Sequence, residues 1–212
     1  TIAYTLSLHD ALPICRALGP SPSWPGRRGC GMSVPLPQPG LQALEAEAVR
    51  RGLLLRLQVS RPLGLGWTLR VGVARRRSGE EGRGGLELLG ELKGWALPTP
   101  AGLRLDTLRV QGQDTAAVGP LICAASFAWA LEATPCRQAT ILAIRDSDAQ
   151  HRRLVRYFRQ LGFHPLRDLG AGPADLAPRL LWGGAGLLMR GDCREGLGRS
   201  IRRLGGGGLD GL

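Results

Sequence analysis

The stretch Ala139-Thr-Ile-Leu-Ala-Ile-Arg-Asp146, continued by Ser147-Asp-Ala-Gln150 and then by residues 151–163, decides the fold that this sequence predicts. Ile141 to Ile144 form a short, continuous apolar run, which is typical of a strand covered on both faces. Ser147 and Gln150 have capping-box spacing, in which the hydroxyl accepts from a backbone N–H three residues on while the amide reaches back. We therefore predict a strand followed directly by a helix.

The predicted helix is amphipathic. Its apolar residues recur at steps of three and four, and its arginines fall on the opposite side. The apolar set is Leu154, Val155, Phe158 and Leu161, and the basic set is Arg152, Arg153, Arg156 and Arg159. Gly162 can adopt the left-handed conformation that closes a helix, and Phe163 can then pack back against Phe158. We predict that the helix ends at Leu161.

Length and composition suit one domain of ordinary size, because the chain has 212 residues and a hydrophobic content of 43%. The net charge of +11 comes almost entirely from arginine, since Lys93 is the single lysine. No run of basic residues exceeds three, and aromatic residues are sparse. We therefore favour scattered, solvated arginines over a nucleic-acid footprint.

The five cysteines form no C-x-x-C pair and no metal-like cluster with the histidines. We expect no metal site, reduced thiols and a cytoplasmic setting. Cys123 lies in an apolar helix, so it is interpreted as a core residue and not as a nucleophile. No segment has the length and apolarity of a membrane span, and no membrane association is expected.

Three regions are expected along the chain. Residues 1–31 are interpreted as a leader, of which Tyr4 to Ile14 look like a translated sequencing adapter. Residues 15–31 are either translated upstream DNA or a disordered leader, and Met32 is a plausible start. Residues 32–194 should form the folded domain. Residues 195–212 are predicted to be a flexible, Gly-rich tail.

The remaining elements predict an antiparallel meander followed by helix, strand and helix. A helix is expected from Leu41 to about Gly52. Strands are expected at 53–59, 67–74, 86–97 (bent at Gly90 or Gly94) and 104–110, then a buried helix from Pro120 to Ala133. After Phe163, residues 164–169, 179–182 and 187–190 are interpreted as strands. The fold class is α/β, with a mixed, mostly antiparallel central sheet flanked by helices.

The loop Thr115-Ala-Ala-Val-Gly119 lies between a predicted strand and the start of a predicted helix. Backbone N–H groups at a helix start, with the helix dipole behind them, can bind an anion such as phosphate. Any strand-to-helix connection exposes such groups, so an ordinary connection is the alternative.

From Leu41 to Arg190 the chain resembles the GNAT superfamily of acyl-CoA-dependent N-acetyltransferases. Two motifs carry the resemblance: Leu108-Arg-Val110 ahead of the loop, and Tyr157-Phe-Arg-Gln-Leu-Gly-Phe163 at the helix end. It is most similar to a branch found in cyanobacteria and plastid-bearing plants, through His151-Arg-Arg-Leu-Val-Arg-Tyr157 and Leu181-Trp-Gly-Gly-Ala-Gly186.

The resemblance implies acetyl-CoA as co-substrate, held where the fourth and fifth strands splay apart. Its amide arm would pair with the backbone of Leu108, Arg109 and Val110. The implied pyrophosphate site is the loop of Thr115, Ala116, Ala117, Val118 and Gly119, and His151 and Phe158 are also implied to contact the cofactor. The implied acceptor is an amine, on a small molecule, a protein N-terminus or a lysine.

Asp106 and Glu91 are the candidates for the base that deprotonates the amine, with a surface ion pair as the alternative for each. Phe158 stands where many GNAT members carry a tyrosine that protonates the leaving thiolate. Tyr157, about a hundred degrees away around the helix, is the remaining catalytic candidate. The loop also lacks the family's Arg or Gln and its alternating glycines.

These departures keep two alternatives open: an acyl-CoA-binding sensor or interaction module, and, less favoured, an RNA-binding basic protein. Trp182 is expected either to line the acceptor cleft or to pack in the core.

Overall fold

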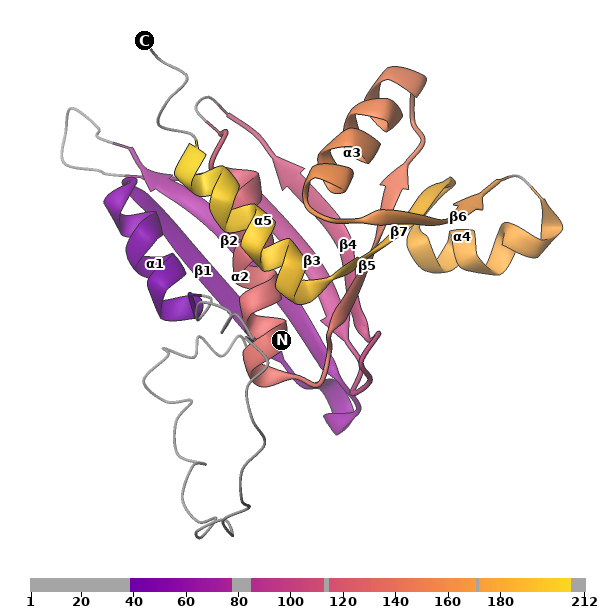
Figure 1. Cartoon of the computed structure of the whole chain (residues 1–212), viewed down its shortest axis with the longest axis horizontal. Coiled ribbons are helices and arrows are strands. Elements are labelled where there is room, and N and C mark those ends of the chain that lie inside the picture. The colour runs from indigo at the N-terminus through magenta and orange to yellow at the C-terminus, as the bar shows by residue number, and fades with distance from the viewer. Residues whose placement is uncertain (1–38, 78–84, 113–114, 171, 207–212) are drawn as a thin grey trace, which may run out of the picture. The chain divides into compact units, whose positions relative to one another are not determined.

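The computed structural model describes residues 39–206, apart from 78–84, 113–114 and 171. The predicted leader, Met32 and residues 207–212 lie outside the described residues. One sheet of seven strands runs through the domain in the order β1-β2-β3-β4-β5-β7-β6 (Figure 1). The α/β class with a mixed, mostly antiparallel sheet is confirmed, because β4 and β5 form the single parallel pair among the described strands.

The first four strands form the predicted antiparallel meander. They are β1 (Leu53–Ser60), β2 (Trp67–Arg76), β3 (Leu86–Ala96) and β4 (Leu103–Val110). A short 3-10 turn, η2 (Pro62–Gly64), joins β1 to β2. Along β2 the side chains of Leu69, Val71 and Val73 are buried while the alternate ones face outward, so one face of the sheet forms the core.

Both glycines at which a bend was predicted lie beside register shifts. One shift falls between Val73 and Ala74, whose partners are Gly90 and Leu88, so Leu89 is the extra residue in β3. The other falls at Gly94, opposite Leu105, and makes Asp106 the extra residue in β4. A Cβ at Gly94 would lie 2.4 Å from the carbonyl oxygen of Arg104, so this close approach requires glycine.

The stretch that decides the fold has the predicted structure. β5 (Gln138–Ile144) leads into α3 (Asp148–Gln160), and the Ser147 hydroxyl accepts from the N–H of Gln150 at 3.3 Å. Gly162 has a φ of 94° and closes the helix, as predicted. The last helical residue is Gln160, one residue before the predicted Leu161. The ring of Phe163 packs 6.0 Å from that of Phe158.

The last two strands, β6 (His164–Leu169) and β7 (Gly186–Asp192), complete the sheet. β7 lies between β5 and β6 and is antiparallel to both. Among the described residues, no helix combines the length and apolarity needed to cross a lipid bilayer.

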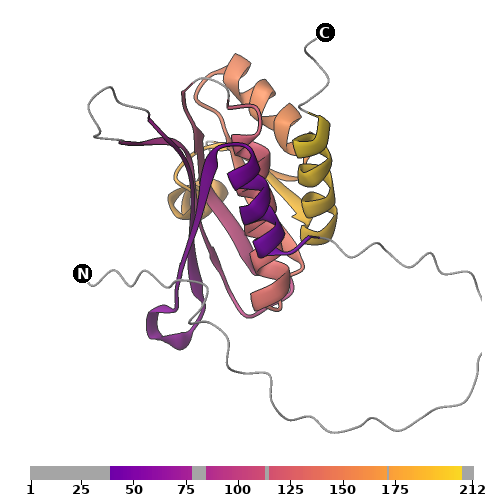
Figure 2. The ribbon, with the colours of Figure 1, turned by 90° about the vertical axis from the view of Figure 1, so that its left-hand side faces the viewer.

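Helices α1 (Leu41–Arg50), α2 (Val118–Ala133) and α5 (Cys193–Gly206) lie on one side of the sheet (Figure 2). α2 is buried all round because α5 covers the side that faces away from the sheet. A Cβ at Gly196 of α5 would lie 2.7 Å from the Phe127 ring, so the two helices approach closely. α2 begins at Val118, two residues before the predicted Pro120, which sits in the first turn, where its missing N–H leaves no bond unmade.

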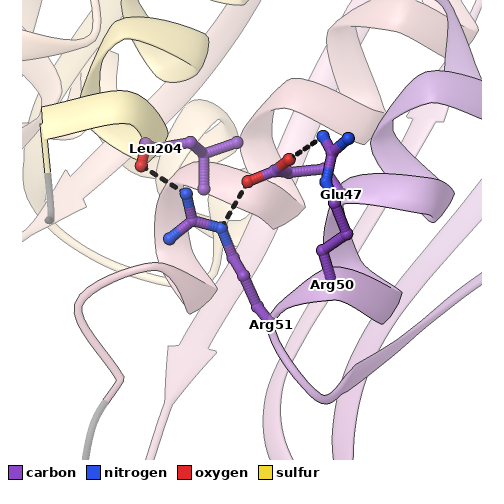
Figure 3. Close-up of polar contacts among 4 residues, drawn as sticks. All are labelled: Glu47, Arg50, Arg51 and Leu204. Carbon is purple, nitrogen blue, oxygen red and sulfur yellow. Dashed lines mark hydrogen bonds and ion pairs between the residues drawn. The ribbon is translucent and has the colours of Figure 1, made fainter.

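The prediction of a flexible tail from residue 195 is wrong for residues 195–206, which belong to α5. The Asp192 carboxylate accepts from the N–H of Glu195 at 2.9 Å and caps the helix start, and Leu197 and Leu204 are buried. At the other end, the Arg51 guanidinium donates to the Leu204 carbonyl at 2.6 Å (Figure 3). The same guanidinium bonds Glu47 at 2.6 Å, so α1 holds the end of α5.

The prediction of a strand at 179–182 is also wrong. These residues lie in a short helix, α4 (Leu176–Trp182), which follows a 3-10 turn, η3 (Pro173–Asp175), and ends at Gly183 with a φ of 76°. α4 lies on the opposite face of the sheet from α1, α2 and α5 (Figure 2). We call this opposite face the outer face.

Candidate functional site

The parallel pair β4 and β5 separates partway along. Their register covers Leu103 to Leu105 against Ala139 to Ile141, although β4 continues to Val110 and β5 to Ile144. The strands therefore part toward the ends from which the chain runs on to α2 and α3. The β5-facing backbone edge at Leu108, Arg109 and Val110 has no strand partner within the described part of the chain, as expected for strands that splay.

The predicted phosphate loop provides fewer donors than its length suggests. The Val118 N–H donates to the Thr115 carbonyl at 2.9 Å, the Leu121 N–H donates to Ala117 at 3.0 Å, and Pro120 has no N–H. Val118 is also fully buried, so it does not offer a group to a ligand. Gly119 is buried as well, so the N–H groups that remain at the helix start belong to Ala116, which is exposed, and to Ala117, which is half-buried.

Tyr157 brings a polar group to the start of α2. A Cβ at Gly119 would lie 2.5 Å from the Tyr157 hydroxyl oxygen, so glycine is what leaves room for this hydroxyl. The hydroxyl is buried and has no hydrogen-bond partner among the described residues. Burial, together with the neighbouring Cys123 thiol, raises the pKa of Tyr157, so the hydroxyl stays protonated at neutral pH and gives up its proton less readily than an exposed tyrosine does.

The expectation for Phe158 is corrected by its surroundings. Its side chain is 3% exposed and lies 6.0 Å from the Phe163 ring, which in turn lies 6.0 Å from Phe127. Phe158 is therefore a core residue with almost no surface to offer a cofactor. The neighbouring Tyr157 approaches the loop instead.

His151 lies at the start of α3, where β5 ends. Its ring is half-buried, and Nδ1 lies 3.3 Å from the carbonyl oxygen of Ile144, within hydrogen-bond reach. The imidazole is thus tied to the last residue of β5, next to the opening between the strands.

Both candidate bases are ion-paired, as the structural alternative predicted. Glu91 lies 3.1 Å from Lys93 and 3.5 Å from Arg70, and the hydrogen bond from Lys93 is the main cause of its lowered pKa. Asp106, the extra residue of β4, lies 2.5 Å from Arg104. Its partial burial raises the pKa of the carboxyl, against the opposing effect of Arg104.

Sequence reasoning missed Arg104, a nearly buried arginine with 5% exposure. Its guanidinium stacks 3.5 Å from the ring centroid of Trp182 and 5.4 Å from that of Trp95, and it donates to the Leu181 carbonyl. Trp182 is therefore half-buried against Arg104 and is not a core residue, while its place in an acceptor cleft stays a prediction. It covers the outer face beside Asp106.

The described cysteines, Cys123, Cys136 and Cys193, are buried free thiols. Burial raises the pKa of Cys123 to about 12, which keeps this thiol protonated and unsuited to nucleophilic attack. Within residues 39–206, as far as they are described, no group of His, Cys, Asp and Glu side chains is arranged to hold a metal ion.

No protein-family model matches the sequence, and no curated protein matches it. Among solved structures, the fold is similar to that of nourseothricin acetyltransferase, with 13% sequence identity over 72% of this chain and 92% of that chain, at a TM-score of 0.40. Identity and TM-score are both too low for this similarity to assign an activity. The element order and the parting of β4 from β5 agree with the fold that the sequence resemblance implied.

Proposed function

We propose that the chain is an acyl-CoA-dependent acyltransferase that moves an acetyl group from acetyl-CoA to an amine. The single observation that carries this proposal is the parting of β4 from β5 after Leu105, next to the start of α2. Where two strands stop pairing, their facing edges present unpaired backbone groups. An extended ligand with amides in its arm can pair with them as an added strand would.

The arm would pair with the edge of Leu108, Arg109 and Val110, while the phosphates would approach Ala116 and Ala117. Few donors remain there, and the loop has no cationic side chain of its own. The arm is therefore expected to contribute more of the binding free energy than the phosphates do.

The reaction needs no covalent intermediate on the protein. The amine nitrogen would attack the thioester carbonyl carbon, the carbon–sulfur bond would break, and the departing thiolate would take a proton. Tyr157 is the proposed proton donor, because its hydroxyl lies beside Gly119 at the start of α2 and is protonated at neutral pH. Asp106 is the preferred base, because its pKa is raised whereas that of Glu91 is lowered.

The proposal is tested first by binding. Saturating acetyl-CoA is expected to stabilise the protein by about 2.7 kcal/mol at a hundredfold excess over Kd, a shift of several degrees in a thermal melt. Ala116→Asp should weaken binding by placing a negative charge at the exposed loop. Ala43→Asp, on exposed α1, is the matched control and should bind like the wild type. No thermal shift with the wild-type protein would refute acyl-CoA binding altogether.

A second candidate is an acyl-CoA-binding sensor without catalysis. The observation that favours it is the pairing of both carboxylates, Glu91 with two cations and Asp106 with Arg104. A paired carboxylate is a weaker base than a free one. Release of free thiol from acetyl-CoA in the presence of a panel of amines separates the two: turnover supports the enzyme, and stabilisation without turnover supports the sensor.

A further inference from the structure

A groove of about 470 Å³ lies between α3 and β7. Its walls include three arginines of α3, Arg152, Arg156 and Arg159, and its floor includes Val155 and Leu187. On a helix, positions separated by four and then three residues share one side, so the three guanidinium groups form a row about 10 Å long. The groove is also lined by His151, which the family resemblance implies at the cofactor, but the arginine row itself uses none of the residues proposed to bind acyl-CoA.

The three arginines are exposed, and none forms an ion pair among the described residues. The arrangement differs from that of nearby arginines: Arg145 pairs with Asp168, and Arg167 pairs with Asp175. The groove thus presents uncompensated positive charge along one wall.

The floor narrows the class of ligand. Val155 and Leu187 are half-buried apolar residues, and a ligand that offers only phosphate groups would leave them exposed to water. Single-stranded nucleic acid is usually bound by stacking of successive bases on several aromatic rings, and the lining of this groove offers one ring, the half-buried imidazole of His151.

We propose that the groove binds an acidic peptide segment of a partner protein. One apolar side chain of the peptide covers Val155 and Leu187, while its carboxylates pair with the arginine row. Each exposed ion pair contributes little by itself and is screened by salt, so the interaction is weak, reversible and sensitive to ionic strength.

The test measures binding of a short fluorescein-labelled peptide, in which glutamates flank a central leucine, to the full chain. Binding is measured by fluorescence anisotropy at low salt. Saturable binding is expected. Replacing the glutamates with glutamine should weaken binding about tenfold or more. Replacing the leucine with serine should also weaken binding, whereas a purely ionic contact would not respond to this change.

On the protein side, R152Q/R156Q should lower the affinity about tenfold or more. R153Q is the matched control: Arg153 is exposed on the same helix but does not line the groove, so its affinity should stay within about twofold of the wild type. Thermal melts verify that both variants are folded. If the double variant does not fold, a lysine-for-glutamate peptide tests the same charge complementarity on the wild-type protein and should not bind.

The proposal is overturned if the wild type shows no saturable binding, or if R153Q loses as much affinity as R152Q/R156Q. It is also overturned if oligo(U) RNA binds more tightly than the peptide and is weakened by the same double variant, which would make the groove a nucleic-acid surface. Displacement of the peptide by low millimolar inorganic phosphate would instead indicate a small-anion site.

Discussion

The guanidinium carbon of Arg104 lies 3.5 Å from the ring centroid of Trp182, and this contact joins α4 to the outer face of the sheet. The same guanidinium bonds the Asp106 carboxylate and the Leu181 carbonyl. One side chain of β4 therefore holds both the short helix and the preferred base.

Arg104→Gln is expected to destabilise the protein by about 2 kcal/mol, since a charge-assisted hydrogen bond is lost and Asp106 keeps a partly buried, unpaired charge. Urea unfolding measures this loss. Asp106→Asn in the same background should recover part of it, because neutralising the carboxylate removes the unpaired charge. Strict additivity of the two changes would contradict the coupling.

Tyr157→Phe is expected to leave stability unchanged or to raise it by up to about 1 kcal/mol, because it removes a buried hydroxyl without a partner among the described residues. If Tyr157 donates the proton to the thiolate, the same change should slow thiol release from acetyl-CoA by about 10²-fold or more. Thermal melts and thiol release on one preparation separate the two effects. A variant that is folded and fully active would exclude the hydroxyl from the reaction.

Gly94→Ala is expected to cost about 3 kcal/mol, because the added methyl would lie 2.4 Å from the backbone oxygen of Arg104. Gly72→Ala on β2 is the matched control, since the nearest atom to its Cβ is a Leu88 methyl at 3.9 Å. That change should be neutral or slightly stabilising. Equal losses of stability at the two positions would show that the close backbone contact at Gly94 is not the cause of the loss.

Glu91→Gln should lower stability at pH 7 by less than about 1 kcal/mol, as expected for a partly exposed ion pair. The folded-state pKa of Glu91 is lowered from 4.5, so the carboxylate stabilises the protein above pH 4.5 and this contribution is lost as the pH falls through the folded-state pKa. The difference between wild type and variant should thus shrink below pH 4.5. Urea unfolding at pH 7 and at acidic pH measures it, and a difference that grows on acidification would contradict the assignment.

Local patterns predicted the elements whose determinants are local. The alternation along β1 and β2 and the capping by Ser147 and Gly162 all concern residues within a few positions of one another. These predictions are confirmed, because the long-range packing favours the same elements as the local pattern does. The register shift at Gly94 was likewise indicated by a single residue type.

The elements that sequence reasoning missed depend on distant contacts. α4 is short, and Trp182 is held by Arg104, a residue far away in the chain. α5 contains Gly196, which disfavours a helix, yet the Phe127 ring leaves no room for a larger residue there. Asp192 and Glu195 have capping-box spacing and could have revealed the helix start.

The candidate site divides in the same way. The parting of β4 from β5 came from the resemblance and agrees with the observed register. The direction of Tyr157 could not be predicted, because it depends on how α3 is placed against α2 and on the space at Gly119. An ion pair of Asp106 could be named as an alternative from the sequence, but neither its partner Arg104 nor the burial of Arg104 against the rings of Trp95 and Trp182 could be predicted.

The packing of α5 on α2 has a consequence for the order in which the chain folds. α2 is apolar on every side, and α5, which covers the side of α2 that faces away from the sheet, is synthesised only after residues 134–192. During synthesis the sheet can assemble against α2 while the opposite side of α2 still faces water. Such a transient apolar surface favours aggregation, so folding is complete only when the last helix arrives.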